Sequence, residues 1–215
     1  KNWIIKAAEA GIVDAQYNLA KHYLDGNLIE SDYCQAFYWF NEAANNGSID
    51  ALCAIGAMYE HGYGVNVDLK KAVEYYQFAS NENNATAMFN LAYCYFTGNG
   101  VRENKKRATY YFTEAAEAGD KDAMIFLAEA FAGTGGVEQD LQTSFEWWKA
   151  AAEAGAEEAY YNLGKCYENG KGTNVDMRKA LEWYLRAAKA GNCYAMNDVG
   201  IYFANGYACE VDEEE

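Results

Sequence analysis

Apolar side chains recur along the chain with a constant period of 36 residues. One column of equivalent positions holds Leu19, Ile55, Leu91, Leu127, Leu163 and Val199. A second column, four residues further on, holds Tyr23, Tyr59, Tyr95, Phe131, Tyr167 and Phe203. Ala15 and Ala20 begin two columns of small residues on the same side. Because these positions share one face of a helix, the first half of each repeat is predicted to be an amphipathic helix.

The second half of each repeat carries its own aromatic columns. One column holds Trp3, Trp39, Tyr75, Tyr111, Trp147 and Trp183, and the next holds Phe40, Tyr76, Phe112, Trp148 and Tyr184. Alanine follows three residues later at Ala43, Ala79, Ala115, Ala151 and Ala187. These positions also share one helical face, so each repeat is predicted to be a pair of helices that pack through their apolar sides.

Capping residues mark the ends of these helices. The expected N-caps of the second helices are Asp32, Asp68, Asn104, Asp140 and Asp176, and those of four first helices are Ser48, Asn84, Asp120 and Asn192. A left-handed residue is expected to end each repeat, at Gly11, Gly47, Asn83, Gly119, Gly155 and Gly191. Glycine also ends the first helices at Gly26, Gly62, Gly98, Gly170 and Gly206. Thr134 interrupts that column, so the turn there is expected to shift by a residue.

At this point the residues carry a family resemblance. The strings AQYNLAKHYLDGN at 15–27 and AYYNLGKCYENGKGTNVDMRKALEWYLRAAKAG at 159–191 resemble Sel-1-like repeats, which are 36-residue relatives of tetratricopeptide repeats. The resemblance implies an all-α fold, an α-solenoid of stacked antiparallel helix pairs in a right-handed superhelix. It covers a single array over 1–215, with full repeats at 12–47, 48–83, 84–119, 120–155 and 156–191 and partial repeats at 1–11 and 192–215. Leu28, at the second loop glycine, and Ser144, at a helix alanine, depart from the pattern.

Charge and hydropathy exclude two kinds of partner. The formal net charge is −15, and phosphate neutralisation requires clustered Lys and Arg, so we expect no nucleic acid to bind. No apolar run approaches the ~20 residues that cross a bilayer, so we expect no membrane insertion. The acidic ending aligns in phase with the loop before a second helix, with Asp212 as its expected N-cap and Glu213 to Glu215 as its first turn. We therefore interpret it as part of the array rather than as an acidic tail.

No set of catalytic or metal-ligating residues recurs in the sequence. His22 and His61 stand outside any zinc spacing, and Gly170-Lys171-Gly172-Thr173 lacks the strand and the upstream glycine of a phosphate loop. We assign Trp39, Trp147, Trp148 and Trp183 to packing, because they recur at helical spacing. The sequence therefore predicts no enzyme, no cofactor and no metal site.

The six cysteines do not repeat in phase. They are Cys34, Cys53, Cys94, Cys166, Cys193 and Cys209. Only Cys94 and Cys166 share a column, and with ~10 Å for each packed helix layer they lie too far apart to form a disulfide. Free buried thiols are the expected state, which favours a reducing compartment such as the cytoplasm.

The remaining faces of the first helices are the candidates for binding. If tetratricopeptide geometry carries over, positions 14, 17, 18, 21, 24 and 25 and their copies line a concave groove. The candidate residues there are Tyr17, Asn18, Lys21, Phe89, Asn90, Tyr93, Phe96, Ile125, Glu129, Tyr161, Asn162 and Lys165. Across these columns acids outnumber lysines, so a basic or neutral partner segment is favoured over an acidic one.

Two interpretations of the repeated asparagine remain open. Its amide can pair with the backbone of a bound peptide, or it can bridge neighbouring helices of the array. At the level of function, the expectation is a non-catalytic scaffold or adaptor that binds a partner protein or peptide in the groove. The alternative is a cell-envelope adaptor that contacts cell-wall sugar or a wall-associated enzyme, and a signal peptide or a lipoprotein cysteine in the precursor would favour it.

Overall fold

A computed structural model describes residues 2–134 and 137–206, and within them it contains twelve α-helices and no strand. The chain divides into two compact units, Lys1–Asp120 (unit 1) and Lys121–Glu215 (unit 2). Unit 1 contains α1 (Asn2–Glu9), α2 (Val13–Asp25), α3 (Tyr33–Asn45), α4 (Ile49–His61), α5 (Leu69–Asn81), α6 (Ala85–Thr97) and α7 (Lys105–Glu117). Unit 2 contains α8 (Lys121–Glu129), the π-helical turn η1 (Ala130–Thr134), α9 (Leu141–Glu153), α10 (Glu157–Asn169), α11 (Met177–Lys189) and α12 (Cys193–Ala204).

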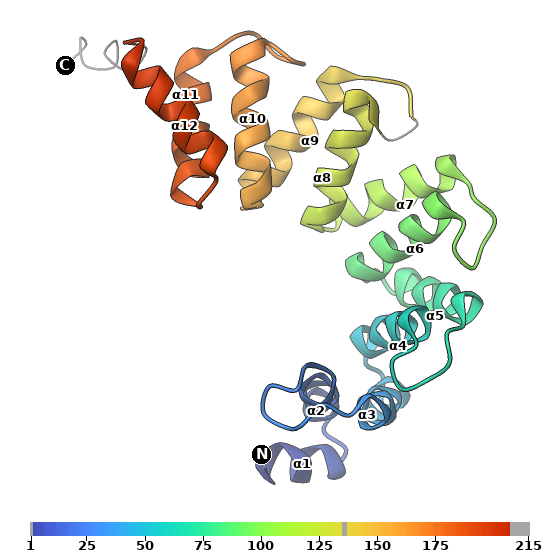
Figure 1. Cartoon of the computed structure of the whole chain (residues 1–215). Coiled ribbons are helices and arrows are strands. Elements are labelled where there is room, and N and C mark those ends of the chain that lie inside the picture. Colours follow the sequence, from blue (N-terminus) through green and yellow to red (C-terminus); the bar gives the residue numbers. More distant parts are fainter. Residues whose placement is uncertain (1, 135–136, 207–215) are drawn as a thin grey trace. The chain divides into compact units, whose positions relative to one another are not determined.

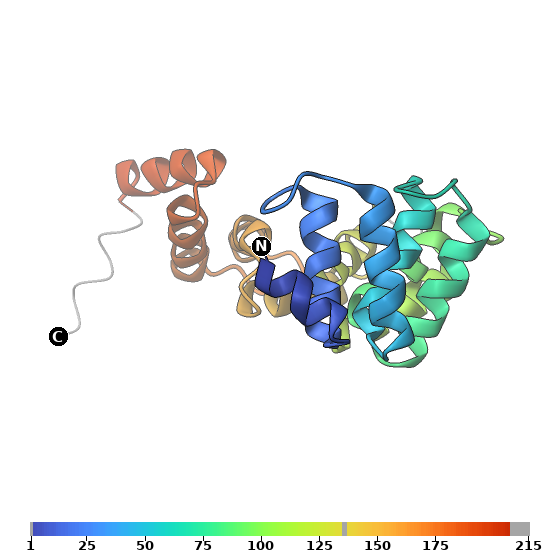
Figure 2. The same cartoon turned by 90° about the horizontal axis from the view of Figure 1, so that it is seen from below.

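Within each unit every helix packs on the next one along the chain (Figure 1). Each repeat therefore contributes two antiparallel helices, and the second helix of one repeat packs on the first helix of the next. Figure 2 shows this succession from another side in the blue to green helices of unit 1. The predicted helix pairs and the all-α class of α-solenoid are confirmed. The expected cap at Asp212 and the helix after it lie outside the described residues.

The core is built from the columns that the sequence shows. Side chains of the leucine column are fully buried from Leu19 to Leu163, as are Phe40, Tyr76, Phe112 and Tyr184 of the second helices. The neighbouring column, which includes Trp39 and Trp147, is only half-buried, and Trp3 is 85% exposed. Trp147, which the sequence assigns to packing, is therefore only partly buried, because its column lies one residue, or about 100°, around the helix from the fully buried ring.

Eight of the nine predicted N-caps are confirmed by side-chain hydrogen bonds. Side chains of Asp32, Asp68, Asn104, Asp140 and Asp176 accept backbone N–H bonds at the starts of α3, α5, α7, α9 and α11. Ser48, Asn84 and Asn192 do the same for α4, α6 and α12. All six repeat-ending residues have positive φ, including Asn83 at 61°. In the fourth repeat the left-handed residue is Gly133, one position before Thr134, so the shifted turn is also confirmed.

Loop glycines hold neighbouring repeats together. A Cβ added at Gly64, Gly100 or Gly172 would overlap the backbone carbonyl at the start of the preceding second helix, which for Gly172 is the carbonyl of Leu141. Only glycine lets the loop approach so closely. Cation–π pairs add a repeated contact within three helix pairs, since Lys71 lies over Tyr59, Arg107 over Tyr95 and Lys179 over Tyr167 at 5.0 to 5.5 Å.

Two combinations of residues occur where the two helices of a pair pack together. Where the first helix has glycine, at Gly56 and Gly164, the second has tyrosine, and an added Cβ would lie 2.7 Å from Tyr76 or 2.6 Å from Tyr184. The hydroxyl of Tyr76 then donates to Glu60 at 2.6 Å, and that of Tyr184 donates to Glu168 at 2.9 Å. The other complete pairs combine alanine with phenylalanine or tryptophan: Ala20 with Phe40, Ala92 with Phe112, and Ala128 with Trp148.

Candidate functional site

The predicted groove residues are divided between the two units, and none of them is fully buried. Asn18, Lys21, Tyr93, Glu129 and Lys165 are exposed. The half-buried members are Tyr17, Phe89, Asn90, Phe96, Ile125, Tyr161 and Asn162. The candidate residues therefore lie on α2 and α6 in unit 1 and on α8 and α10 in unit 2.

In unit 1 several candidate rings cover the core. Tyr17 packs edge-on against Phe40 with ring centroids 5.5 Å apart, and Phe89 and Phe96 pack against Phe112 at 5.5 and 6.5 Å. These rings contribute to stability as well as to the surface. Tyr93, which is 44% exposed, is the candidate ring of α6 that reaches furthest into solvent.

The repeated asparagines do not all have the same environment. The Asn90 amide reaches the Sγ of Cys53 on α4 at 3.7 Å, so it bridges two neighbouring first helices. The Asn162 amide donates to the carbonyl of Glu158 in its own helix at a long 3.4 Å and faces a hollow. Asn18 is exposed. Asn90 therefore bridges neighbouring helices, whereas the side-chain amide of Asn162 can still form hydrogen bonds with a bound partner.

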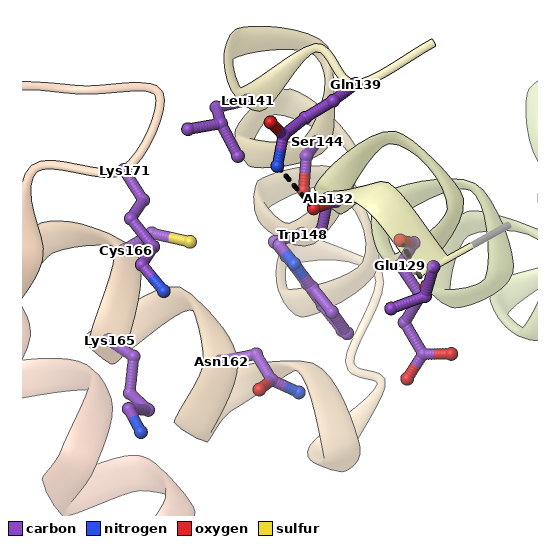
Figure 3. A pocket seen from close by; sticks show the side chains of 11 residues that line it. Glu129, Ala132, Gln139, Leu141, Ser144, Trp148, Asn162, Lys165, Cys166 and Lys171 are labelled. Carbon is purple, nitrogen blue, oxygen red and sulfur yellow. Dashed lines mark hydrogen bonds between the residues drawn. The ribbon is translucent and has the colours of Figure 1, made fainter. Parts of the chain in front are cut away.

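Unit 2 contains a hollow of about 550 Å³ between the fourth and fifth repeats, here named the α8–α10 hollow. It brings together three predicted residues, Glu129, Asn162 and Lys165, whereas Ile125 and Tyr161 do not line it. The other lining residues are Ala132, Thr134, Gln139, Leu141, Ser144, Trp148, Cys166 and Lys171 (Figure 3). Its volume lies within the ~300–1,000 Å³ range of pockets that bind ligands.

One lining side chain is shorter than its counterparts in the other full repeats. Ala132 occupies the position of Leu24, Glu60, Phe96 and Glu168. Glu60, Phe96 and Glu168 each contact the aromatic ring of the second helix in their own repeat, which is Tyr76, Phe112 or Tyr184. The π-helical turn η1 carries Ala132, and Ser144 is tied to the carbonyl of Ala128 at 2.6 Å. The end of the Trp148 ring thus lies at the wall of an open space (Figure 3).

Charged side chains of the hollow come from both of its walls. Lys165 lies on α10, Lys171 lies on the loop after it, and Glu129 ends α8 (Figure 3). Burial raises the pKa of the Cys166 thiol to about 11, with Lys171 acting in the opposite direction. This thiol is therefore protonated near neutral pH and is not a nucleophile. Ala132, Trp148, Cys166 and Lys171 are not among the predicted binding residues, although Ala132 stands out in the sequence as a small residue within its column.

A smaller hollow of about 280 Å³, here named the α10–α12 hollow, lies on the other side of Lys165. It is lined by Tyr161, Lys165, Glu168, Asp198, Ile201 and Tyr202. The Tyr161 hydroxyl donates to Asp198 at 3.0 Å, and Tyr202 donates to Glu168 at 3.1 Å. Burial and the Asp198 hydrogen bond raise the pKa of Tyr161 to about 12. Its charged groups are thus two carboxylates and one lysine.

The described cysteines are free, as expected. Cys53, Cys94 and Cys166 are buried, but Cys34 and Cys193 are exposed, so the expectation of burial is wrong for these two. Their exposure follows from their position in the first turns of α3 and α12, away from the apolar columns. Cys209 lies outside the described residues.

Metal-binding groups of side chains and membrane-spanning helices are both absent from the described residues. Within 2–134 and 137–206, no group of three or more His, Cys, Asp and Glu side chains is placed to hold a metal ion. Over the same two ranges, the helices are too short or too polar to cross a membrane.

Known proteins share the repeat sequence and the fold of this chain. A family model described as Sel1 repeat matches residues 13–48, 49–84, 85–120, 121–155 and 157–192. No curated protein sequence matches the chain. Among solved structures, c5321, a protective antigen of uropathogenic Escherichia coli strains with an SLR fold, is 29% identical with a TM-score of 0.84 over 96% of this chain and 44% of its own. A Sel1 repeat protein from Oxalobacter formigenes is 29% identical with a TM-score of 0.81, over 95% and 84% of the two chains.

A more distant likeness extends only to the fold. The immunity protein Pa5087 from Pseudomonas aeruginosa is 20% identical with a TM-score of 0.57, over 85% of this chain and 67% of its own. The chain spans less than half the length of the E. coli antigen.

The stacked helix pairs and their open first-helix surfaces define an α-solenoid of the helical-repeat class. The five matched segments follow the same 36-residue period. The chain belongs to the Sel1 repeat family. Proteins built from these repeats are in general scaffolds for protein–protein interaction, and the fold is typically non-catalytic.

Proposed function

We propose that this chain is a non-catalytic scaffold that binds an extended segment of a partner protein across its first helices. The observation that carries the proposal is the α8–α10 hollow, where Glu129, Asn162 and Lys165 meet beside an aromatic wall. Partner segments gain affinity from a few apolar side chains that fill such spaces and from polar groups at the rim.

The contacts available to a segment differ along unit 2. An apolar side chain in the α8–α10 hollow contacts Trp148 and Leu141, and Asn162 is positioned to pair with its backbone. A basic side chain over the α10–α12 hollow faces Glu168 and Asp198. This arrangement supports the expected preference for a segment that is neutral or basic overall.

In unit 1 the surface of α2 and α6 is proposed as a separate contact surface for a partner protein. Tyr93 offers an exposed ring, and Asn18 and Lys21 offer polar contacts on α2. The cell-envelope alternative stays a prediction and gains no support from these surfaces.

A peptide selection tests the proposal. A random peptide library displayed on phage is selected against the 215-residue chain, and the affinities of the selected peptides are measured by fluorescence anisotropy. Ala132→Leu narrows the hollow beside Trp148 and introduces the residue that the first repeat has at Leu24. Because the new side chain takes the place of one buried side chain of the partner, worth ~1.5–3 kcal/mol, the affinity should fall by about 10- to 100-fold.

The matched control is Phe78→Ser, which removes an exposed ring, 63% accessible, from the second helix α5. Tyr93→Ser is the corresponding change on the unit 1 surface. Circular dichroism shows whether each variant keeps its helices. The proposal fails if no peptide is selected, or if the affinity is unchanged in both Ala132→Leu and Tyr93→Ser.

A further inference from the structure

The charge inside the α8–α10 hollow is opposite to that of the protein. The chain carries a formal charge of −15, yet the charged residues that line the hollow are two lysines and one glutamate. A local reversal of this kind attracts a ligand group that the rest of the surface repels. The hollow therefore differs in its electrostatics from the surface around it.

The two lysines have no carboxylate partner. Among the described residues the ion pairs are Lys105 with Glu103 and Lys179 with Asp176, so Lys165 and Lys171 are not held by an acid. Lys165 lies 5.5 Å from the Tyr161 ring, and the ammonium of Lys171 extends down beside Cys166 (Figure 3). Both ammonium groups remain available to an incoming anion.

The opposite side of the hollow combines apolar and polar side chains, since Ser144 and Gln139 lie beside Trp148 and Leu141 (Figure 3). Trp148, which is 6% exposed, and Leu141, which is 40% exposed, face the lysine side across the open space (Figure 3). The walls thus combine an apolar surface with a pair of cations, and Asn162 adds an amide at one end. A group that matches both walls has an apolar body and a negative charge.

We propose that the α8–α10 hollow binds an acidic anchor of the partner segment, in which an apolar side chain packs on Trp148 and an adjacent carboxylate lies between Lys165 and Lys171. This inference rests on the proposed function and specifies its ligand chemistry. Because Glu168 and Asp198 occupy the far side of Lys165, the two hollows select opposite charges. A segment that crosses α10 therefore has a fixed direction, with its acidic residue toward α8 and its basic residue toward α12.

Three small probes of nearly identical shape isolate the charge. Phenylbutyrate, phenylbutyramide and phenylbutylamine share an apolar body and carry a negative, neutral or positive end. Each is titrated into the whole chain while two-dimensional proton–nitrogen NMR follows the indole signals of the five tryptophans. The signal of Trp148 is identified by its disappearance in Trp148→Phe. It should move with phenylbutyrate at about fivefold lower concentration than with the amide, as expected for two solvent-exposed charge pairs.

Variants separate the charge from the shape of the hollow. Lys165→Gln with Lys171→Gln should abolish the preference for the carboxylate and leave the binding of the amide unchanged. The matched control, Lys189→Gln, removes an exposed lysine at the end of α11 and should keep the preference. Ala132→Leu should abolish the movement of the Trp148 signal for all three probes.

The inference is overturned if the amide or the amine binds as tightly as the carboxylate, if the preference survives in the double lysine variant, or if no probe moves the Trp148 signal. These results leave the proposed function to be decided separately by the peptide selection. Peptides that lose affinity in Ala132→Leu but carry no acidic residue would uphold the scaffold and reject the acidic anchor.

Discussion

Glycine occupies the small-residue position of α4, α10 and α12, and its replacement by alanine should have opposite effects in different helices. At Gly56 the new Cβ would lie 2.7 Å from the Cδ1 and Cε1 atoms of Tyr76. At Gly200 the new Cβ would meet no atom within 4 Å. The two substitutions are chemically identical, so the difference between them measures the packing of the tyrosine ring.

The expected magnitudes follow from two terms. Alanine is favoured over glycine in a helix by ~1 kcal/mol, so Gly200→Ala should stabilise the protein by up to that amount. Overpacking of a core costs ~1–3 kcal/mol, and the Tyr76 ring cannot easily retreat because it is 1% exposed and its hydroxyl is bound to Glu60. Gly56→Ala should therefore lower the free energy of unfolding by about 0 to 2 kcal/mol, which is ~1–3 kcal/mol less favourable than Gly200→Ala.

A double substitution tests whether contact with the Tyr76 ring causes the loss of stability in Gly56→Ala. Gly56→Ala with Tyr76→Phe recreates the combination that the first repeat has at Ala20 and Phe40, and the freed ring should recover about 1 kcal/mol of the loss. Urea unfolding followed by circular dichroism gives the stabilities, and hydrogen exchange in α4 and α12 locates the changes. If Gly56→Ala stabilises the protein as much as Gly200→Ala does, the close packing of glycine against tyrosine is refuted.

Three further predictions concern other contacts and are tested by urea unfolding. Gly172→Ala, which introduces the overlap with a carbonyl of the preceding repeat, should cost more than Gly191→Ala, where φ is +96° but the space is open and the cost is ~1–2 kcal/mol. Trp148→Ala should cost ~3–5 kcal/mol and the half-buried Trp147→Ala less, so an equal cost would contradict the assigned burial. Burial raises the pKa of the Cys94 thiol from 9.0 to about 12, so the unfolded chain loses this proton first and stability falls as pH rises through that window. Cys94→Ala should reduce this slope by at most ~1.4 kcal/mol per pH unit, and an unchanged slope would contradict the burial.

The repeat period predicts most of the fold. Each cap residue and each left-handed glycine follows from local backbone chemistry, so Asp68 or Gly47 can be assigned from the sequence alone. The apolar columns likewise identify Leu91 and Phe112 as core, because period alone places them on the inner face. These features depend on short stretches of chain, and the structure confirms them.

Features that depend on neighbours were harder to predict. Burial differs sharply between Trp147 and Trp148, although both belong to aromatic columns, because the exact rotation of the helix decides which ring faces inward. The hollow depends on a comparison across repeats, since Ala132 is unremarkable by itself and matters only because its counterparts are larger. The periodic pattern describes what the repeats share, whereas the candidate site lies where one repeat differs.

The small side chain of Ala132 has a consequence for how such arrays diversify. The position of Ala132 holds a different residue in most of the full repeats, whereas the leucine column that forms the core is nearly constant. A short side chain at this position is therefore expected to open a space in one repeat while the buried columns that stack the repeats stay the same. A solenoid can therefore change its partner when a short side chain arises at this position in a different repeat, while the core that stacks the repeats stays the same.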